Sequence, residues 1–299
     1  MRKLLLGLVS AAALMTAAEA ADIKVINADA WFPEGPIWYQ GKLYYVEYGR
    51  NTIDSWDGTK NTIFWKQDGC GPSAVVVTPK GEFLTTCYDS GTIGHVSADG
   101  KTLTPYSKDK DGNGFVGPND LAVDKKGGVY FTGSGHEGPV IDAAVYYIGT
   151  DGTVTKAADD LHNANGLALT NDGKILYVIE TEENRLLAFD VHDDGSLTGR
   201  RVFLNLNDMF PNAPHIWPDG MKIDAKGEIY IGQSPRSLDA PGKIIVVDSQ
   251  GKLLRTIAVP SVSMPNLTFG PGEKVIYVMA LDQIDKAPWH GKVYEVPNQ

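Results

Sequence analysis

A short segment recurs six times along the chain, and this repetition constrains the fold more than any other feature. Each copy has a proline or small residue, a polar residue, a short apolar run, a glycine-containing turn and a second run rich in Tyr, Val, Ile and Phe. Successive polar residues are 39, 46, 46, 54 and 47 positions apart; they are Glu34, Ser73, Asn119, Asn165, Asp219 and Asn266. Such a period matches one four-stranded blade. The repetition predicts an all-β fold, a six-bladed β-propeller.

The turns inside the copies support this prediction. Thr78-Pro79-Lys80-Gly81 and Asp224-Ala225-Lys226-Gly227 are two examples of hairpin chemistry. Beyond the first twenty residues, no stretch keeps a 3.6-residue apolar period for more than about two turns, so few helices are expected. A β-sandwich is the rival all-β architecture, but it does not need the same motif six times. We expect a single domain over residues 21–299.

Residues 1–20 have the features of a signal peptide. A basic start, Met1-Arg2-Lys3, precedes an apolar run from Leu4 to about Ala18, and Ala18-Glu19-Ala20 is a small-residue cleavage motif. The apolar run is short for a bilayer span, and nothing later in the sequence resembles one. The sequence therefore predicts an exported protein, periplasmic or secreted, with no membrane partner.

The charge of the chain bears on its partners. The formal net charge is −10, and removal of Arg2, Lys3 and Glu19 with the signal peptide would make it −11. An acidic balance argues against nucleic acid or an anionic membrane surface as a partner. A small-molecule substrate is the partner that remains, and the oligomeric state is not indicated.

The chain has two cysteines, Cys70 and Cys87. Export to an oxidising compartment permits a disulfide. The turn at residues 78–81 would place Cys87 roughly opposite Pro72, which brings the two sulfurs near each other. We predict a Cys70–Cys87 disulfide, with two unpaired thiols as the alternative.

The polar residue of each copy predicts a metal-binding central channel. The first strand of a propeller blade lies innermost, so these six residues should converge on one axis. All six carry oxygen and none offers sulfur or imidazole, which suits a hard cation such as Ca²⁺, Mg²⁺ or Mn²⁺ better than tetrahedral zinc. Glu34 and Asp219 would offset the charge of the cation, and Asn119 and Asn165 would complete the protein ligands.

A structural role is the alternative for these residues, because short polar side chains often start strands and cap turns. We assign that role to Ser73, which is short, and to Asn266, which has no charged neighbour in the sequence.

Four stretches of the chain resemble the senescence marker protein, gluconolactonase and luciferin-regenerating enzyme family; they are residues 34–38, 118–124, 165–178 and 218–221. The resemblance covers nearly the whole mature chain. It implies a six-bladed propeller with one divalent metal in the channel, Ca²⁺ by preference and Mg²⁺, Mn²⁺ or Zn²⁺ as alternatives. The metal ligands of the family fall on Glu34, Asn165 and Asp219, and a further asparagine that contacts substrate or metal-bound water falls on Asn119.

The same resemblance implies hydrolysis of a small lactone or ester, in which the metal polarises the carbonyl group and activates water. Asp219 and Asn119 are the implied catalytic residues, with Asp219 as the base; a histidine or metal-bound hydroxide is the alternative base. Sugar-lactone hydrolases of the family commonly carry an arginine shortly before the Pro-Asn-Asp motif. Residues 114–117 contain none, so the sequence does not favour a gluconolactone-type substrate.

Other activities stay open at this point. A phosphotriesterase-like hydrolase would use the same metal, and a non-enzymatic propeller could bind a ligand while its calcium is structural. A nucleophilic triad is not supported, because the sequence has no Gly-x-Ser-x-Gly motif, and a phosphate-binding glycine loop is also missing.

Two histidines and two aromatic residues are candidates for contact with substrate. His215 precedes Asp219 by four residues, and His136 follows the third hairpin; either could serve as a base, with a loop or surface role as the alternative. Trp217 and Phe115 could form an apolar pocket wall, although aromatic residues near strand starts also belong to cores.

Overall fold

The computed structural model describes residues 23–136, 138–235 and 241–298, so the proposed signal peptide lies outside the described residues. The secondary structure consists almost entirely of strands, with a four-residue helix α1 (Leu206–Met209) and two 3₁₀ turns (Tyr48–Arg50 and Pro271–Glu273). The prediction of an all-β chain is confirmed. Within these ranges, no helix is long and apolar enough to cross a membrane.

The strands form antiparallel groups that follow the chain order. Two groups are separate sheets, and each of the two larger sheets consists of two groups joined by a single bridge, Gly35–Ala74 in one and Gln233–Met264 in the other. We number the groups along the chain. Group 1 contains β2 (Pro33–Tyr39), β3 (Lys42–Glu47), β4 (Thr52–Trp56) and β5 (Asn61–Lys66); group 2 contains β6 (Pro72–Val77), β7 (Phe83–Cys87) and β8 (Thr92–Val96); group 3 contains β9 (Pro118–Val123), β10 (Val129–Gly133), β11 (Ala143–Ile148) and β12 (Val154–Leu161).

The second half of the chain continues the pattern. Group 4 contains β13 (Ala164–Leu169), β14 (Ile175–Glu180), β15 (Arg185–Val191) and β16 (Leu197–Asn205); group 5 contains β17 (Pro218–Ile223), β18 (Ile229–Gln233), β19 (Ile244–Val247) and β20 (Leu253–Ile257); group 6 contains β21 (Ser263–Phe269), β22 (Val275–Leu281) and β23 (His290–Pro297) together with β1 (Lys24–Trp31).

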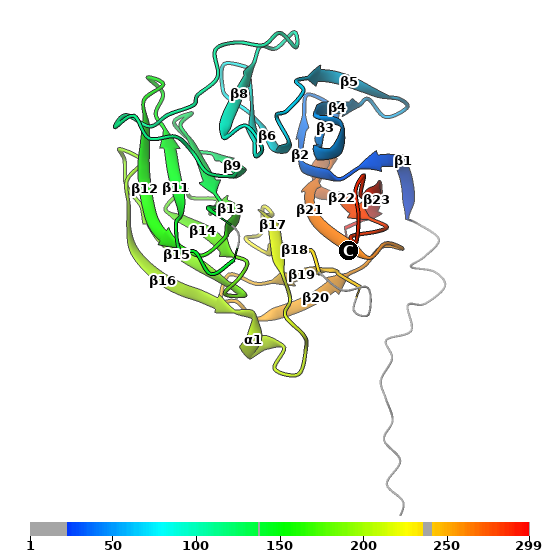
Figure 1. Cartoon of the computed structure of the whole chain (residues 1–299). Helices are drawn as coiled ribbons and strands as arrows, with labels where there is room; N and C mark the ends of the chain where they lie inside the picture. The colour runs from blue at the N-terminus through cyan, green and yellow to red at the C-terminus, as the bar shows by residue number, and fades with distance from the viewer. Residues whose placement is uncertain (1–22, 137, 236–240, 299) are drawn as a thin grey trace, which may run out of the picture.

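The groups are arranged around a common centre (Figure 1). The first strands β2, β6, β9, β13, β17 and β21 surround the centre, and each contacts the next one along the chain, while β21 contacts β2. The strand β1 from the start of the chain completes group 6 by pairing with β23 near its end, from Lys24 opposite Glu295 to Trp31 opposite His290. The first and the last described strands are therefore held in one sheet.

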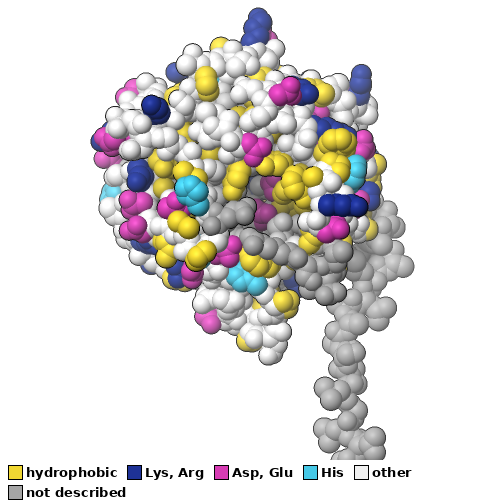
Figure 2. Space-filling model, in the orientation of Figure 1, with side chains coloured by type: hydrophobic (Ala, Val, Ile, Leu, Met, Phe, Trp, Pro, Cys, Tyr) yellow, Lys and Arg dark blue, Asp and Glu magenta, His cyan; other side chains and the backbone are white. Residues whose placement is uncertain are grey.

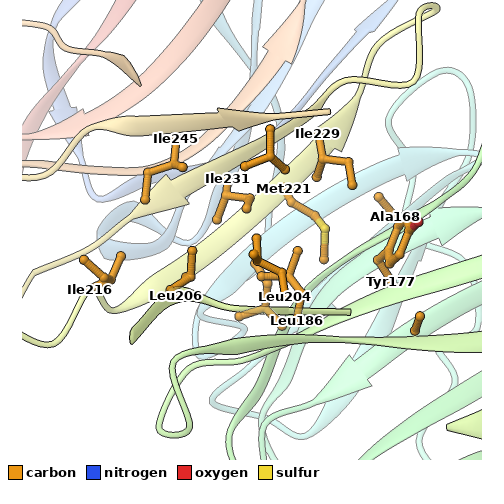
Figure 3. Close-up of a cluster of buried hydrophobic side chains, with 13 residues drawn as sticks. Ala168, Tyr177, Leu186, Leu204, Leu206, Ile216, Met221, Ile229, Ile231 and Ile245 are labelled. Carbon is orange, nitrogen blue, oxygen red and sulfur yellow. The ribbon is translucent and has the colours of Figure 1, made fainter. Parts of the chain in front are cut away.

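The core lies between neighbouring groups. Six clusters of buried apolar side chains each join two successive groups, and the last joins group 6 to group 1. Because side chains alternate along a strand, one strand serves two clusters: in β10, Phe131 packs toward group 2 and Tyr130 toward group 4. In Figure 3, Met221 and Ile231 of group 5 lie against Leu186 and Leu204 of group 4. Both faces of each group are thus covered.

A disulfide joins Cys70, just before β6, to Cys87 at the end of β7, with their Cα atoms 4.4 Å apart. Cys87 lies opposite Pro72 in the ladder, and the turn closes with a hydrogen bond from the Gly81 N–H to the Thr78 carbonyl oxygen. The predicted disulfide and the register behind it are confirmed.

Candidate active site

The structure brings together the four residues predicted to bind metal. Glu34, Asn119, Asn165 and Asp219 line one cavity of about 220 Å³. They are the second residues of β2, β9, β13 and β17, so each comes from a different group. Figure 2 shows a hollow at the centre of this face, with acidic side chains at its floor and hydrophobic ones on its rim.

Breaks in the ladder aim these side chains. The pairing of each first strand with its second strand shifts register at or beside the polar residue, between Glu34 and Ile37 in β2 and between Pro218 and Met221 in β17, for example. The other four first strands have equivalent shifts. An irregularity of this kind turns a side chain out of the pleat. The polar residues can therefore face the centre instead of a neighbouring group.

Glycine lets adjacent first strands approach each other closely. A Cβ atom at Gly166 would lie 2.4 Å from the backbone oxygen of Asp219, and one at Gly35 would lie 2.1 Å from the Cα atom of Ala74. Both glycines directly follow a polar residue of the site. Any other residue would push the strands that carry the site residues apart.

Each asparagine of the site is joined to the group before it by one buried threonine. The Thr86 Oγ1 donates to the Asn119 carbonyl oxygen, and the Thr132 Oγ1 donates to that of Asn165, both at 2.7 Å. The same hydroxyl of Thr132 accepts from the Asp120 N–H at 3.1 Å. Each threonine is fully buried. The position of each asparagine is therefore fixed by the second strand of the preceding group.

The site holds two buried carboxylates close together. The pKa of Glu34 is raised, first by burial and then by the negative charge of Asp219, and one of its oxygens accepts hydrogen bonds from the Gly35 N–H at 2.8 Å and from Asn266 at 3.0 Å. Burial also raises the pKa of Asp219, against the lowering effect of hydrogen bonds from Asn165 and Ser234. Such a pair is costly unless a positive charge compensates it.

A third carboxylate lies behind the site. Asp120, 2% exposed, follows Asn119 in β9, and burial raises its pKa while Lys222 lowers it. The Lys222 Nζ is 3.9 Å from an oxygen of Asp120. The negative charge of Asp120 adds to the field at Glu34 and Asp219. In the sequence, Asp120 is marked only as part of the Pro-Asn-Asp motif.

The donor set fits a hard divalent cation. Two carboxylates and two carboxamides offer oxygen atoms to one cavity, and oxygen is the donor that Ca²⁺, Mg²⁺ and Mn²⁺ prefer. Within the described ranges, no group of three or more His, Cys, Asp or Glu residues is placed to hold a metal. A cation at this site would therefore depend on the oxygens of Asn119 and Asn165 as well as on the carboxylates.

A second cavity of about 420 Å³ shares Asn119, Asn165 and Asp219 with the first and continues away from Glu34. Sequence reasoning missed most of its wall. In groups 1 to 5, the residue directly after the second strand carries a hydroxyl group and lines one or both cavities; these residues are Tyr48, Tyr88, Ser134, Thr181 and Ser234. The signal was present in the sequence, because a hydroxyl residue ends the second run of five copies.

A recurring left-handed residue and its hydrogen bond position these five hydroxyl residues. In the same five groups, the residue two before the polar residue has a left-handed backbone; the φ angles are 51° at Phe32, 57° at Gly71, 56° at Gly117, 52° at Asn163 and 56° at Trp217. Its carbonyl oxygen accepts from the N–H of the hydroxyl residue at 2.8 to 3.1 Å. This conformation costs a bulky residue such as Phe32 or Trp217 about 1–2 kcal/mol.

The remaining candidates have different surroundings. Trp217 lines the larger cavity. His215 does not, but its ring lies 4.1 Å from that of Trp217 and its Nε2 donates to the Thr181 carbonyl oxygen at 2.8 Å. His136 lines neither cavity; its side chain is 66% exposed and pairs with Asp142.

Phe115 lines neither cavity either. Its side chain is 6% exposed and packs 5.0 Å from both Phe131 and Tyr146, within the cluster between groups 2 and 3. The structure therefore favours the core role for Phe115 over the pocket wall.

Asn266 and Ser73 also have defined places. Asn266 is buried and donates to Glu34, so it supports the carboxylate pair. Ser73 lines the smaller cavity beside Glu34.

The fold and the site define a class of protein: an all-β chain with a carboxylate and carboxamide cavity at the starts of its first strands. The sequence profile of the SMP-30/Gluconolactonase/LRE-like region matches residues 32–281, and the chain belongs to this family.

Relatives of known name agree with this membership. The lactonase drp35 of Staphylococcus saprophyticus is 28% identical over 265 residues, which cover 84% of this chain and 78% of the relative. The gluconolactonase of Zymomonas mobilis is 26% identical over 288 residues, which cover 86% and 78%. A solved gluconolactonase structure from Xanthomonas campestris aligns with a TM-score of 0.75 at 24% identity, over 95% of this chain and 93% of that one. This likeness supports a β-propeller fold.

Proposed function

We propose that the protein is a six-bladed β-propeller that holds one divalent cation, Ca²⁺ by preference, in its central channel and hydrolyses a small lactone. One observation carries the proposal: two buried carboxylates and two carboxamides from four groups share one cavity. The names of the relatives, lactonase and gluconolactonase, support the reaction class. The contacts between successive first strands and between β21 and β2 support the closed six-bladed ring.

The cation would be held by Glu34, Asn165 and Asp219, with Asn119 facing the same space. When bound, it supplies Lewis-acid polarisation of a carbonyl oxygen. The buried carboxylates are suited to this role because they repel each other in its absence, and binding of a divalent cation removes that repulsion.

Glu34 and Asp219 have different surroundings, which suggests different roles. One Glu34 oxygen is held by Gly35 and Asn266, and Glu34 lines only the smaller cavity. Asp219 lines both cavities, so it can reach a water in the larger one. We assign Glu34 to cation binding alone and Asp219 to both cation binding and proton acceptance.

In the proposed reaction, the oxygen of a water attacks the lactone carbonyl carbon while Asp219 accepts its proton. The ring C–O bond then breaks, and Asp219 returns the proton to the departing alkoxide. The product is a hydroxy acid. Asn119 would orient the carbonyl group from the other side of the cavity.

The proposal is tested by a panel of lactones, aryl esters and phosphotriesters, with metal content measured on the same samples. We expect wild type to hydrolyse lactones, to lose this activity when a chelator removes the metal and to regain it when Ca²⁺ is added. Asp219→Ala should lose both the cation and turnover. The matched control Asp68→Ala, which replaces an exposed carboxylate outside the cavities, should keep both. Unchanged lactone turnover in folded Asp219→Ala would overturn the proposal.

We also propose that the protein is exported to the periplasm or secreted. The features of residues 1–20 support this proposal, and the Cys70–Cys87 disulfide agrees with an oxidising compartment. Detection of the mature chain beginning at Ala21 in a periplasmic or culture fraction would test it.

A further inference from the structure

Phe32 and Trp217 occupy backbone positions that suit other residue types. Equivalent positions in groups 2, 3 and 4 hold Gly71, Gly117 and Asn163, and glycine and asparagine adopt left-handed backbone at the least cost. A bulky aromatic residue is an exception at such a position. Both aromatic side chains line the larger cavity. A strained residue that faces a cavity indicates that its side chain serves the cavity.

The larger cavity has an apolar half and a polar half. Apolar side chains come from groups 5, 6 and 1, and the aromatic ones are Trp217, Trp289 and Phe32. The Phe32 ring lies 5.8 Å from that of Trp289. Most polar side chains come from groups 2, 3 and 4, and two come from group 5; they are Tyr88, Asn119, Ser134, Asn163, Asn165 and Thr181, with Asp219 and Ser234 from group 5. A ligand would therefore meet apolar surface on one side and hydrogen-bonding groups on the other.

The charges of the cavity limit the ligand further. Of the described residues that line the two cavities, none is Lys, Arg or His, and the carboxylates are Glu34 and Asp219. In the cation-loaded site the two carboxylates are compensated by the cation, and a negatively charged ligand would gain no ion pair from any of these side chains. The lining therefore favours a neutral ligand.

We propose that Phe32 and Trp217 determine substrate specificity by selecting neutral lactones that carry an apolar substituent on the ring. This inference rests on the lactonase function proposed above. The substituent would lie against the aromatic half of the cavity, and the ester group would face Asn119 and Asp219. Burial of the substituent would supply the preference.

A binding measurement tests this selection without catalysis. Two lactams, 2-pyrrolidinone and 5-hexyl-2-pyrrolidinone, share a ring of lactone shape that resists hydrolysis and differ in one apolar chain. We expect Ca²⁺-loaded wild type to bind the hexyl compound at least tenfold more tightly in calorimetry. Equal dissociation constants for the two lactams would overturn the inference, and this comparison needs no variant.

Substitutions locate the preference. Phe32→Asn and Trp217→Asn introduce the residue type found at Asn163, which tolerates the same backbone, and each should reduce the affinity ratio at least threefold. The matched control is Gln40→Asn, at an exposed left-handed residue in the turn between β2 and β3, and it should keep the ratio of wild type. If Phe32→Asn and Trp217→Asn lower the Tm but keep the ratio, the two aromatics have only a packing role and the inference is wrong.

The two proposals fail in different ways. Tighter binding of the hexyl lactam without hydrolysis of any lactone would overturn the proposed lactonase function and leave the binding preference assigned to Phe32 and Trp217 standing. Hydrolysis of lactones with no preference between the lactams would do the reverse.

Discussion

Replacement of Thr132 by valine should weaken both the fold and the proposed cation site. The Thr132 hydroxyl accepts from the Asp120 N–H and donates to the Asn165 carbonyl oxygen, and all of these groups are inside the protein. Valine has nearly the same shape but makes neither hydrogen bond. An unsatisfied buried polar group costs about 1–3 kcal/mol. We therefore expect Thr132→Val to lower the free energy of unfolding by about 2–4 kcal/mol.

The effect on cation binding distinguishes this threonine from its neighbours. Thr132 holds a cation-site residue of group 4 from group 3, so its loss should reduce Ca²⁺ affinity at least tenfold. Thr85 is equally buried but donates to Ala74 within its own group, at 2.7 Å. Thr85→Val should therefore lose stability and keep Ca²⁺ affinity.

Urea unfolding of the metal-free proteins measures their stability, and calorimetric titration with Ca²⁺ measures their Ca²⁺ affinity separately. Wild-type Ca²⁺ affinity in folded Thr132→Val, or an equal loss of affinity in Thr85→Val, would refute the argument that contacts between groups position the site.

Three further predictions follow from other features. Gly166→Ala places a Cβ 2.4 Å from a backbone oxygen of β17 and should lower the free energy of unfolding in urea by about 1–3 kcal/mol. In the control Gly114→Ala, the nearest atom to the new Cβ is 3.9 Å away, so stability should change by less than ~0.5 kcal/mol. Burial raises the pKa of Glu47 in the folded protein to about 7. Between about pH 4.5 and 7 the unfolded chain has already lost this proton while the folded protein keeps it, so the free energy of unfolding should fall as the pH rises through this range. Glu47→Gln should remove that part of the pH dependence, and a variant whose stability depends on pH as wild type does would contradict this prediction. Replacing Cys70 and Cys87 together by alanine opens a loop with a sequence separation of 17 residues and should lower the free energy of unfolding by roughly 3 kcal/mol. A loss of less than about 1 kcal/mol would mean that the unfolded chain is constrained even without the disulfide.

The parts of the fold that the sequence predicts are those set by short-range patterns. The hairpin register that opposes Cys87 to Pro72 follows from one turn and one alternation. The meeting of Glu34, Asn119, Asn165 and Asp219 follows from their equal places in a repeated unit. In both cases, the information lies within a single copy or in the comparison of copies.

The parts that it does not predict depend on contacts between groups. Phe115 and Phe32 both precede a polar residue, by four and two positions; Phe32 is itself the left-handed residue and lines the cavity, whereas after Phe115 the left-handed residue is Gly117. Asn266 looked isolated in the sequence, yet its partner Glu34 lies 232 residues away. Neither relation leaves a periodic signal in the sequence.

The pairing of β1 with β23 has a consequence for when the cavity can exist. Phe32 directly follows β1 and Trp289 directly precedes β23, and the Phe32 N–H donates to the Trp289 carbonyl oxygen at 3.0 Å. The aromatic half of the cavity is therefore built where the first described strand pairs with the last. Ligand binding on that side must wait for the last strand to be synthesised and docked, so occupancy of the cavity would report that β1 and β23 have paired.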